Sequence, residues 1–274
     1  MPAMRLKLVA GMVAAVLGVA SSIAVSSELS REAVFGRHLD ARDELQALPE
    51  FGDASARVLQ RYQDGRIVAE LALPAGWQWP VQVLPSGSFE ILVLEGRLQW
   101  GDEELSRLDY LQWPAGTPSK NFSSLTPTKA LVFIDPAKSS DPAAARVVKT
   151  TPTDWGGSTV SKRDTGVELK LEIRSLFKDE QTGRWTWLLR AGPDLVLPWE
   201  VHRTVEEVYL IEGEYQLHEC LPAGKTRFDY RPGGYFHRPA GIVHGGPDSG
   251  SPGDILMLLR APTELTVEFR SGCP

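Results

Sequence analysis

Residues 199–214 of the chain read Trp-Glu-Val-His-Arg-Thr-Val-Glu-Glu-Val-Tyr-Leu-Ile-Glu-Gly-Glu, and residues 233–244 read Gly-Gly-Tyr-Phe-His-Arg-Pro-Ala-Gly-Ile-Val-His. The two spacings are Glu-x-His-x3-Glu-x6-Gly and Gly-x5-Pro-x-Gly-x2-His. Residues two apart on a β-strand point to the same face, so Glu200 and His202 can face one interior together. His244 follows a Pro-x-Gly bend on a distant strand, and closing a barrel would bring it to them. The candidate metal ligands are therefore His202, Glu206, His244 and Glu200.

The first half of the chain carries a related pattern. Val-Leu-Glu-Gly at 93–96 and Asp-Tyr-Leu-Gln-Trp-Pro-Ala-Gly at 109–116 precede Leu-Ile-Glu-Gly at 210–213 and Gly-Tyr-Phe-His-Arg-Pro-Ala-Gly at 234–241. Alternating apolar and polar segments between Pro and Gly residues are typical of antiparallel strands. A repeated unit of this kind predicts an all-β protein with two tandem β-barrels.

The second-half spacing resembles the two signature motifs of the cupin superfamily, except that Glu200 stands where the first His of that pattern is expected. The run at 199–214, together with a first copy that lacks ligands, resembles bicupins of the ChrR-like and DUF4437 group. This likeness extends over about residues 51–269. It implies two double-stranded β-helix (jelly-roll) barrels, a bound divalent metal ion and frequent homodimers. It implies no particular reaction, because one fold hosts many functions.

Two imidazoles with one or two carboxylates suit Fe, Mn, Zn or Ni as divalent ions. A set that includes Glu200 favours Fe or Mn, whereas His202, Glu206 and His244 alone form the face of two His and one carboxylate found in non-haem iron oxygenases. Both sets remain open. No catalytic residue is assigned, but His237 could face the cavity and bond to a metal ligand.

The first copy serves as an internal control for the metal site. When the glycines and prolines of the two copies are aligned, the three ligands expected first are replaced by Pro85, Phe89 and Ser119. We therefore expect the first barrel to be a structural or subunit-contact domain that binds no metal at that position.

Other residues near the motifs have two possible roles. Aromatic side chains could line a pocket for an apolar molecule or simply fill a barrel interior: Trp185, Trp187, Trp199, Tyr209, Tyr215 and Tyr235. Three arginines could meet a substrate carboxylate but are expected at the surface: Arg190, Arg203 and Arg238. We expect Glu207 to point outward, and His38 and His218 to be ordinary polar residues.

The N-terminus indicates export. Arg5 and Lys7 precede a mostly apolar stretch at 8–25, so residues 1–27 are predicted to be a signal peptide, with an uncleaved anchor as the alternative. The mature protein would then be periplasmic or secreted, without a stable membrane span. In such a compartment Cys220 and Cys273 could form a disulfide, or could remain apart.

The expected domain order follows from these patterns. Residues 28–50 are predicted to form a helical arm, 51–147 a degenerate first cupin barrel, 148–165 a linker and 166–274 a metal-binding second barrel. The net charge of -6 argues against nucleic-acid binding, so a small molecule is the expected partner. The preferred function is a metal-dependent small-molecule enzyme, with a dioxygenase as the example. The alternative is a non-catalytic binding or sensing module.

Overall fold

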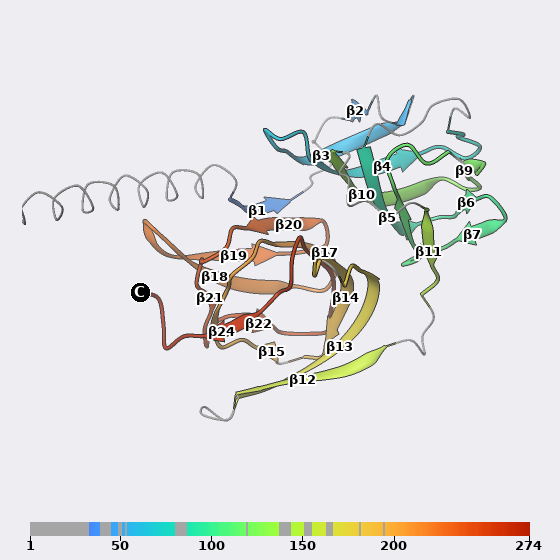
Figure 1. Ribbon diagram of the computed structural model, residues 1–274. Helices are drawn as coiled ribbons and strands as arrows, with labels where there is room; N and C mark the ends of the chain where they lie inside the picture. Colours follow the sequence, from blue (N-terminus) through green and yellow to red (C-terminus); the bar gives the residue numbers. More distant parts are fainter. Residues whose placement is uncertain are drawn as a thin grey trace, which may run out of the picture.

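The computed structural model consists almost entirely of β-strands arranged as two barrels (Figure 1). Each barrel consists of two facing sheets. We call the sheet that faces the other barrel the inner sheet, and the sheet on the far side the outer sheet. The structure describes residues 33–38, 45–48, 51–52, 54–79, 87–118, 120–136, 144–150, 155–162, 167–180, 182–193 and 195–274, with the backbone alone at 157–162 and 167–170. The tandem jelly-roll architecture predicted from the repeat is confirmed.

The first barrel has a large inner sheet and a small outer sheet. Its inner sheet has the order β11-β8-β5-β10-β4-β3-β2, and its outer sheet the order β7-β6-β9. The strands are β2 (Gln46–Ala47), β3 (Ser55–Arg61), β4 (Ile67–Leu73), β5 (Gly87–Glu95), β6 (Leu98–Trp100), β7 (Glu103–Leu105), β8 (Tyr110–Trp113), β9 (Phe122–Ser124), β10 (Thr128–Pro136) and β11 (Arg146–Val148).

Aromatic rings fill the interior of the first barrel. The Trp113 ring lies 4.8 Å from that of Trp79, 4.7 Å from that of Trp100 and 5.5 Å from that of Phe89, between ring centroids. Full burial of one such ring contributes about 1.5 to 3 kcal/mol to stability. Phe89 thus occupies core space at the position of an expected ligand in the second copy. The other two replacements, Pro85 and Ser119, lie outside the described residues.

The second barrel has two large sheets. Its inner sheet has the order β1-β20-β17-β23-β14-β13-β12, and its outer sheet the order β15-β22-β18-β21-β16-β24, with β19 paired to β18. The strands are β1 (Val34–His38), β12 (Gly156–Lys162), β13 (Val167–Lys178), β14 (Trp185–Ala191), β15 (Leu195–Val196), β16 (Trp199–His202), β17 (Glu206–Glu212), β18 (Tyr215–Leu221), β19 (Gly224–Tyr230), β20 (Gly234–Arg238), β21 (His244–Gly245), β22 (Gly250–Ser251), β23 (Ile255–Ala261) and β24 (Val267–Phe269).

Two segments predicted to lie outside the barrels belong to the second inner sheet. The helical arm predicted at 28–50 is wrong where the structure describes it, because β1 pairs with β20 and β2 pairs with β3. The predicted linker at 148–165 includes β12, which pairs along its whole length with β13. Backbone pairing with a sheet edge outweighs the weak local pattern of these segments.

Paired glycines mark the internal repeat. Gly96 and Gly213 have φ angles of 82° and 86°. A Cβ would lie 2.3 Å from the carbonyl oxygen of Pro127 in the first case and 2.2 Å from that of Asp254 in the second. Only glycine fits such a close approach at positive φ. The same turn is therefore built twice.

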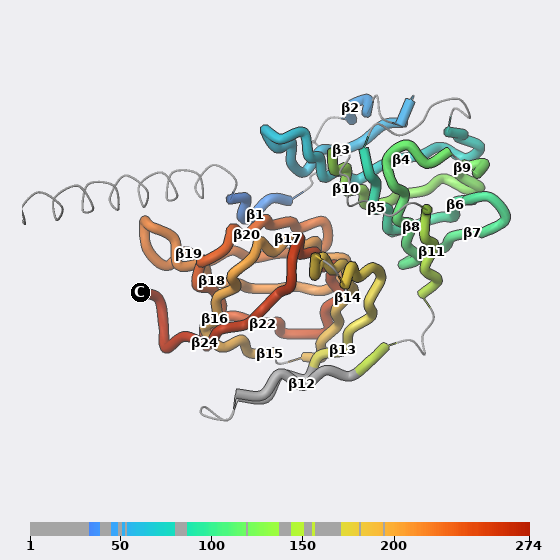
Figure 2. Tube along the Cα trace, viewed as in Figure 1, coloured from blue at the N-terminus to red at the C-terminus, as the bar shows by residue number. Residues whose placement is uncertain are grey.

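The two barrels lie side by side (Figure 2). Their inner sheets pack against each other through a shared apolar cluster that includes Leu92, Leu131, Leu188 and Leu258. Arg260 lies buried in this interface and binds three carboxylates, those of Glu90, Asp135 and Glu207. Paired, hydrogen-bonded carboxylates are the form in which buried charge is tolerated.

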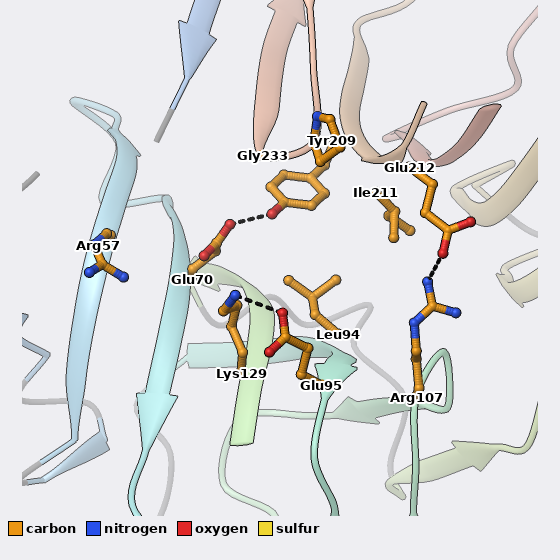
Figure 3. Close-up of a pocket in the computed structure, with 11 residues that line it drawn as sticks. Arg57, Glu70, Leu94, Glu95, Arg107, Lys129, Tyr209, Ile211, Glu212 and Gly233 are labelled. Atoms are coloured by element: carbon orange, nitrogen blue, oxygen red, sulfur yellow. Dashed lines mark hydrogen bonds and ion pairs between the residues drawn. The ribbon is translucent and has the colours of Figure 1, made fainter. Parts of the chain in front are cut away.

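A cavity of about 510 Å³ opens between the barrels beside this interface (Figure 3). Its charged side chains bind one another: Lys129 Nζ lies 2.8 Å from Glu95 Oε1, and Arg107 forms an ion pair with Glu212. The Tyr209 hydroxyl donates to Glu70 across the interface. The contacts of Arg107 with Glu212 and of Tyr209 with Glu70 join the two barrels at the margin of their interface.

Cys220 and Cys273 form a disulfide, with their Cα atoms 5.5 Å apart. The bond ties the C-terminal tail, which follows β24, to β18 of the second outer sheet. The predicted signal segment lies outside the described residues. Within the part of the chain that is described, no helix has the length and hydropathy needed to cross a membrane.

Candidate metal centre

The second outer sheet places three potential ligands side by side. Glu200 and His202 lie on the same face of β16, as strand parity predicts, and both line the barrel cavity. Glu200 lies directly opposite His244 in the register between β16 and β21. The strand after the Pro-x-Gly bend therefore brings His244 to the first motif, and Glu200 Oε1 lies 3.4 Å from His244 Nε2.

Backbone carbonyls orient both imidazoles. His202 Nδ1 lies 3.0 Å from the carbonyl oxygen of Thr266, and His244 Nδ1 lies 3.1 Å from that of Ile242. A carbonyl oxygen only accepts hydrogen bonds, so Nδ1 carries the proton in each ring. The lone pair of each Nε2 is then free, as in metal sites where a partner outside the coordination sphere fixes the tautomer.

The ligand atoms of Glu200, His202 and His244 all lie within 4.8 Å of one another. Burial lowers the pKa of His244 well below its usual value, with the nearby Arg238 acting in the same direction. The imidazole is therefore neutral, which is the form that binds metals. Burial also raises the pKa of Glu200. A nearby cation would favour the charged form of this carboxylate.

Glu206 lies beside the group of three, across from Arg238 in the register between β17 and β20. Its Oε2 atom lies 3.7 Å from His202 Nε2 and forms an ion pair with Arg238 Nη1. The other side of the Arg238 guanidinium binds Glu219, with Nη2 to Oε1 at 2.7 Å. Burial opposes the charge on Arg238, but Glu219 and Glu206 outweigh it and raise the pKa of the guanidinium.

A cavity of about 260 Å³ extends from these groups between the two sheets of the second barrel. Apolar side chains form most of its wall, including Val208, Phe236, Met257 and Leu259 from the inner sheet. The polar groups thus lie together against a predominantly apolar chamber, the usual design of a small-molecule site.

Comparison with known proteins agrees with this geometry. The ChrR Cupin-like domain family matches residues 145–261. The fold is similar to that of a candidate dioxygenase from Nostoc punctiforme PCC 73102, with 18% identity, a TM-score of 0.58 and coverage of 90% of this chain and 85% of that chain. The chain has the fold of a two-barrel cupin, and its second barrel matches the ChrR Cupin-like domain family.

Two further solved structures share the cupin fold. A candidate glyoxylate-induced protein from Pseudomonas aeruginosa has 15% identity and a TM-score of 0.62, over 88% of this chain and 99% of that chain. A variant of oxalate decarboxylase from Bacillus subtilis has 12% identity and a TM-score of 0.55, over 86% of this chain and 80% of that chain. At these identities the likeness shows the fold alone. No curated protein sequence matches this one.

The donor set of this cupin fits a divalent metal ion. Glu200, His202 and His244 offer one carboxylate and two oriented imidazole nitrogens, a combination that suits first-row transition metals. The Glu206–Arg238 pair beside this set has no counterpart at the matching position of the first barrel, which the structure describes. There, Phe89 lies opposite Trp113 as Glu206 lies opposite Arg238 in the second barrel.

Several residues singled out in the sequence lie away from the cavity. His237, which the sequence left as a possible cavity residue, does not face the cavity: its ring packs against Tyr62 of the first barrel, with centroids 5.0 Å apart. Glu207 does point away from the cavity, but it is buried in an ion pair with Arg260 at the interface between the barrels, where a surface position or a salt bridge at the barrel mouth was expected. Strand parity identified the face, but could not show that a second barrel covers it.

Some of the remaining candidate residues line the cavity, and the others lie outside it. Three of the six aromatic residues line the cavity, namely Trp185, Trp187 and Tyr215. Arg190 and Arg203 pair at the surface with Glu172 and Glu268, as expected. The two other histidines have ordinary hydrogen-bond partners: His38 Nε2 binds the carbonyl oxygen of Asp229, and His218 Nδ1 binds the Ser249 hydroxyl.

Two buried charged residues of the site were missed: Arg238, which lines the cavity, and Glu219, which binds Arg238. Arg238 was expected at the surface but is 2% exposed, and Glu219 was not singled out although it is 0% exposed. In both cases strand parity could have shown that the side chain points into the barrel. Glu219 continues the inward series of Tyr215 and Leu217, while Arg238 shares its face with Phe236. A charged residue at an inward-facing strand position is the sequence signal that would have identified both residues.

Proposed function

We propose that the second barrel binds one divalent metal ion through Glu200, His202 and His244 and acts with it on a small molecule held in the adjoining cavity. The convergence of the three ligand atoms within 4.8 Å carries this proposal. Both imidazole Nε2 lone pairs are directed into the site because backbone carbonyls hold the opposite nitrogens. Accidental polar residues on a barrel wall would have no reason to share this orientation.

The residues of the chain have separable roles in this proposal. Bound there, the metal would act as a Lewis acid that polarises an oxygen of the bound molecule. His202 and His244 supply two imidazole nitrogens, and Glu200 supplies a carboxylate oxygen. Arg238 holds Glu206 at the edge of the site. The apolar wall excludes water and positions the substrate.

A dioxygenase-like reaction is the finer form of the proposal. Two His with one carboxylate and open positions are the set associated with non-haem iron oxygenases. Among the described residues of the site, Glu206 and Glu219 are both engaged by Arg238, so neither is a free general base. Chemistry that depends on the metal more than on a protein acid or base suits such a site.

Metal analysis of the purified protein beside a His244→Ala variant tests the metal site. We expect the wild type to retain about one Fe, Mn, Zn or Ni ion per chain and the variant to lose it. His218→Ala is the matched control, since His218 is buried in the same sheet but bonded to Ser249. Equal metal content in the wild type and the His244→Ala variant would contradict the proposal.

A non-catalytic binding or sensing module is the second candidate. The engagement of Glu206 and Glu219 by Arg238 favours it too, because binding needs no free acid or base. Oxygen consumption by the metal-loaded protein with a panel of phenols and diketones separates the two. Turnover supports the enzyme, whereas ligand binding without turnover across the panel supports the module.

We also propose that the protein functions in an oxidising compartment, the periplasm or the cell exterior. The disulfide between Cys220 and Cys273 supports this, because such bonds persist outside the reducing cytosol. Fractionation of the native host, with thiol alkylation of each fraction, tests it. Reduced protein confined to the cytosol would contradict it.

A further inference from the structure

We infer that the cavity of the second barrel selects small neutral molecules with an apolar body and excludes carboxylates. This rests on the proposed function, since it counts the metal ion among the charges of the site. It narrows the expected substrates from small molecules in general to neutral molecules with an apolar body.

The cavity has two chemically different parts. The ionisable groups gather where the two sheets meet at the first motif: Glu200, His202, Glu206, Arg238 and His244. The rest of the wall is apolar or aromatic: Leu171, Ile173, Trp185, Trp187, Leu189, Leu195, Leu197, Val208, Tyr215, Phe236, Met257, Leu259, Leu265 and Val267. A molecule in the chamber therefore contacts hydrocarbon and ring surfaces over most of its body.

Among the described residues that line the cavity, Arg238 is the only Lys or Arg, and each of its three nitrogens already binds a carboxylate. Its Nε lies 3.1 and 3.0 Å from the two carboxylate oxygens of Glu219, and its Nη2 lies 2.7 Å from Oε1. Its Nη1 binds Glu206, and its guanidinium carbon lies 4.6 Å from the centre of the Phe236 ring. A substrate carboxylate would have to compete for a guanidinium that two glutamates already neutralise.

The charge balance of the site leads to the same result. Three carboxylates, those of Glu200, Glu206 and Glu219, face the single guanidinium of Arg238. A divalent ion brings this buried group to neutrality. An anionic substrate would add an uncompensated charge where solvent is largely excluded, and burying such a charge is strongly unfavourable. A neutral molecule leaves the balance intact.

The size and shape of the cavity narrow the class of expected substrates further. The volume of about 260 Å³ holds roughly nine non-hydrogen atoms, at the ~30 Å³ that one water molecule takes in the liquid. Trp185 and Trp187 lie stacked along the wall, with ring centroids 4.2 Å apart. Flat aromatic faces favour offset or edge contacts with another ring. A monocyclic molecule with one uncharged polar group fits this description.

Acetophenone and benzoate form a matched pair of probes, because they have the same number of non-hydrogen atoms and differ mainly in charge. Binding to the metal-loaded protein is measured by calorimetry or by quenching of tryptophan fluorescence. We expect acetophenone to bind at least about tenfold more tightly than benzoate. Equal binding, or tighter binding of benzoate, would overturn the inference.

Glu219→Gln tests the cause of this selectivity. It removes one of the two carboxylates that engage Arg238 and leaves one positive charge uncompensated, so benzoate should gain about tenfold in affinity while acetophenone changes little. Glu172→Gln is the matched control, since Glu172 pairs with Arg190 at the surface. An unchanged benzoate affinity in folded Glu219→Gln protein would overturn the role of Arg238. If that variant does not fold, the relative affinities of the wild type for acetophenone and benzoate decide whether the inference holds.

Metal content distinguishes this inference from the proposed function. Protein that retains its metal but prefers benzoate would contradict the selectivity alone. Protein that binds no metal yet prefers acetophenone would contradict the metal site, while leaving the uncharged preference of the cavity in place.

Discussion

Glu200 determines what kind of metal site this barrel forms. It lies opposite His244 in the strand register, and it belongs to the group of three whose ligand atoms converge. Glu206 has a competing partner in Arg238. We therefore expect Glu200→Gln to weaken metal binding by more than about 100-fold, above the 10–100-fold typical of partners outside direct coordination. Competition with a chelator of known affinity measures this.

Glu206→Gln is the comparison for that experiment. Because the Glu206 carboxylate is shared with Arg238, its replacement should cost about 10- to 100-fold in metal affinity, as for a partner that only orients a ligand. A larger loss for Glu206→Gln than for Glu200→Gln would reverse the roles of the two carboxylates. Glu200→His restores the usual cupin pattern and should retain metal.

Glu90 gives a pH-dependent contribution to stability that is remote from the metal site. Burial alone would raise the pKa of its carboxyl group, but Arg260 and Arg184, with hydrogen bonds from Thr186 and Tyr110, hold this pKa below its usual value of 4.5. A carboxyl group with a lowered pKa in the folded state stabilises the fold above its usual pKa. That stability is lost as the pH falls through the folded-state value.

Glu90→Gln should therefore destabilise the protein at pH 7 by about 1.5 to 3 kcal/mol, the usual range for hydrogen bonds to charged groups. The difference from the wild type should shrink below pH about 4, where protonation begins to remove the same charge. Urea unfolding at several pH values measures it. Glu104→Gln, in an exposed pair with Arg97, should have little effect at any pH. A difference that is constant from pH 7 to pH 3 would argue against this role of Glu90.

At the scale of elements, β24 supports the strand that carries two candidate ligands. It pairs with β16 so that Phe269 lies opposite Glu200 and Val267 opposite His202. The carbonyl of Thr266, just before β24, orients the imidazole of His202. The disulfide anchors the tail that follows β24. A covalent bond far along the chain thus helps to hold the site.

Replacing both Cys220 and Cys273 by Ser should lower the free energy of unfolding by up to about 4 kcal/mol, the loop-entropy value for a cross-link of this span. Metal affinity should fall several-fold as β24 becomes less firmly held. Urea unfolding followed by tryptophan fluorescence gives the first quantity and chelator competition the second. Wild type treated with reductant should behave like the variant. An unchanged unfolding midpoint would show that the tail is held by strand pairing alone.

The sequence predicted the elements that carry strong local signals. The paired motifs placed the barrel strands, the glycine turns and the shared face of Glu200 and His202, because each depends on strand parity or on a special backbone conformation. The edge strands β1 and β12 were missed, since their pairing depends on a sheet formed far along the chain. For the same reason the partners of Glu206 could not be predicted, because they arise from strands that meet only in the folded barrel.

At the scale of the whole molecule, the two barrels pack through equivalent residues. The Tyr110 hydroxyl donates to Glu90 at 2.8 Å in the first barrel, and the Tyr235 hydroxyl donates to Glu207 at 2.9 Å in the second. Glu90 precedes Ile91 in β5 as Glu207 precedes Val208 in β17. A duplicated tyrosine–carboxylate pair on each side indicates that the interface joins like surfaces, as in a dimer of a single barrel.

At the centre of this interface the two barrels carry different residues at equivalent positions. Phe133 lies opposite Glu90 in the first barrel, whereas Arg260 lies opposite Glu207 in the second. The two meet, with the guanidinium carbon of Arg260 4.9 Å from the centre of the Phe133 ring. One arginine therefore serves the carboxylates of both barrels, which two identical subunits could not arrange without placing two guanidinium groups together.

Arg260→Met should destabilise the protein by about 3 to 5 kcal/mol, because it leaves Glu90, Asp135 and Glu207 buried without their shared guanidinium. Adding Glu90→Gln and Glu207→Gln to the same chain removes two of the orphaned charges and should recover much of the loss. Urea unfolding measures both variants. Arg260→Met alone should retain its metal under native conditions, since Arg260 lies on the face of β23 that points away from the cavity. Stability that falls further in the triple variant would show that the carboxylates support the interface by means other than their charge.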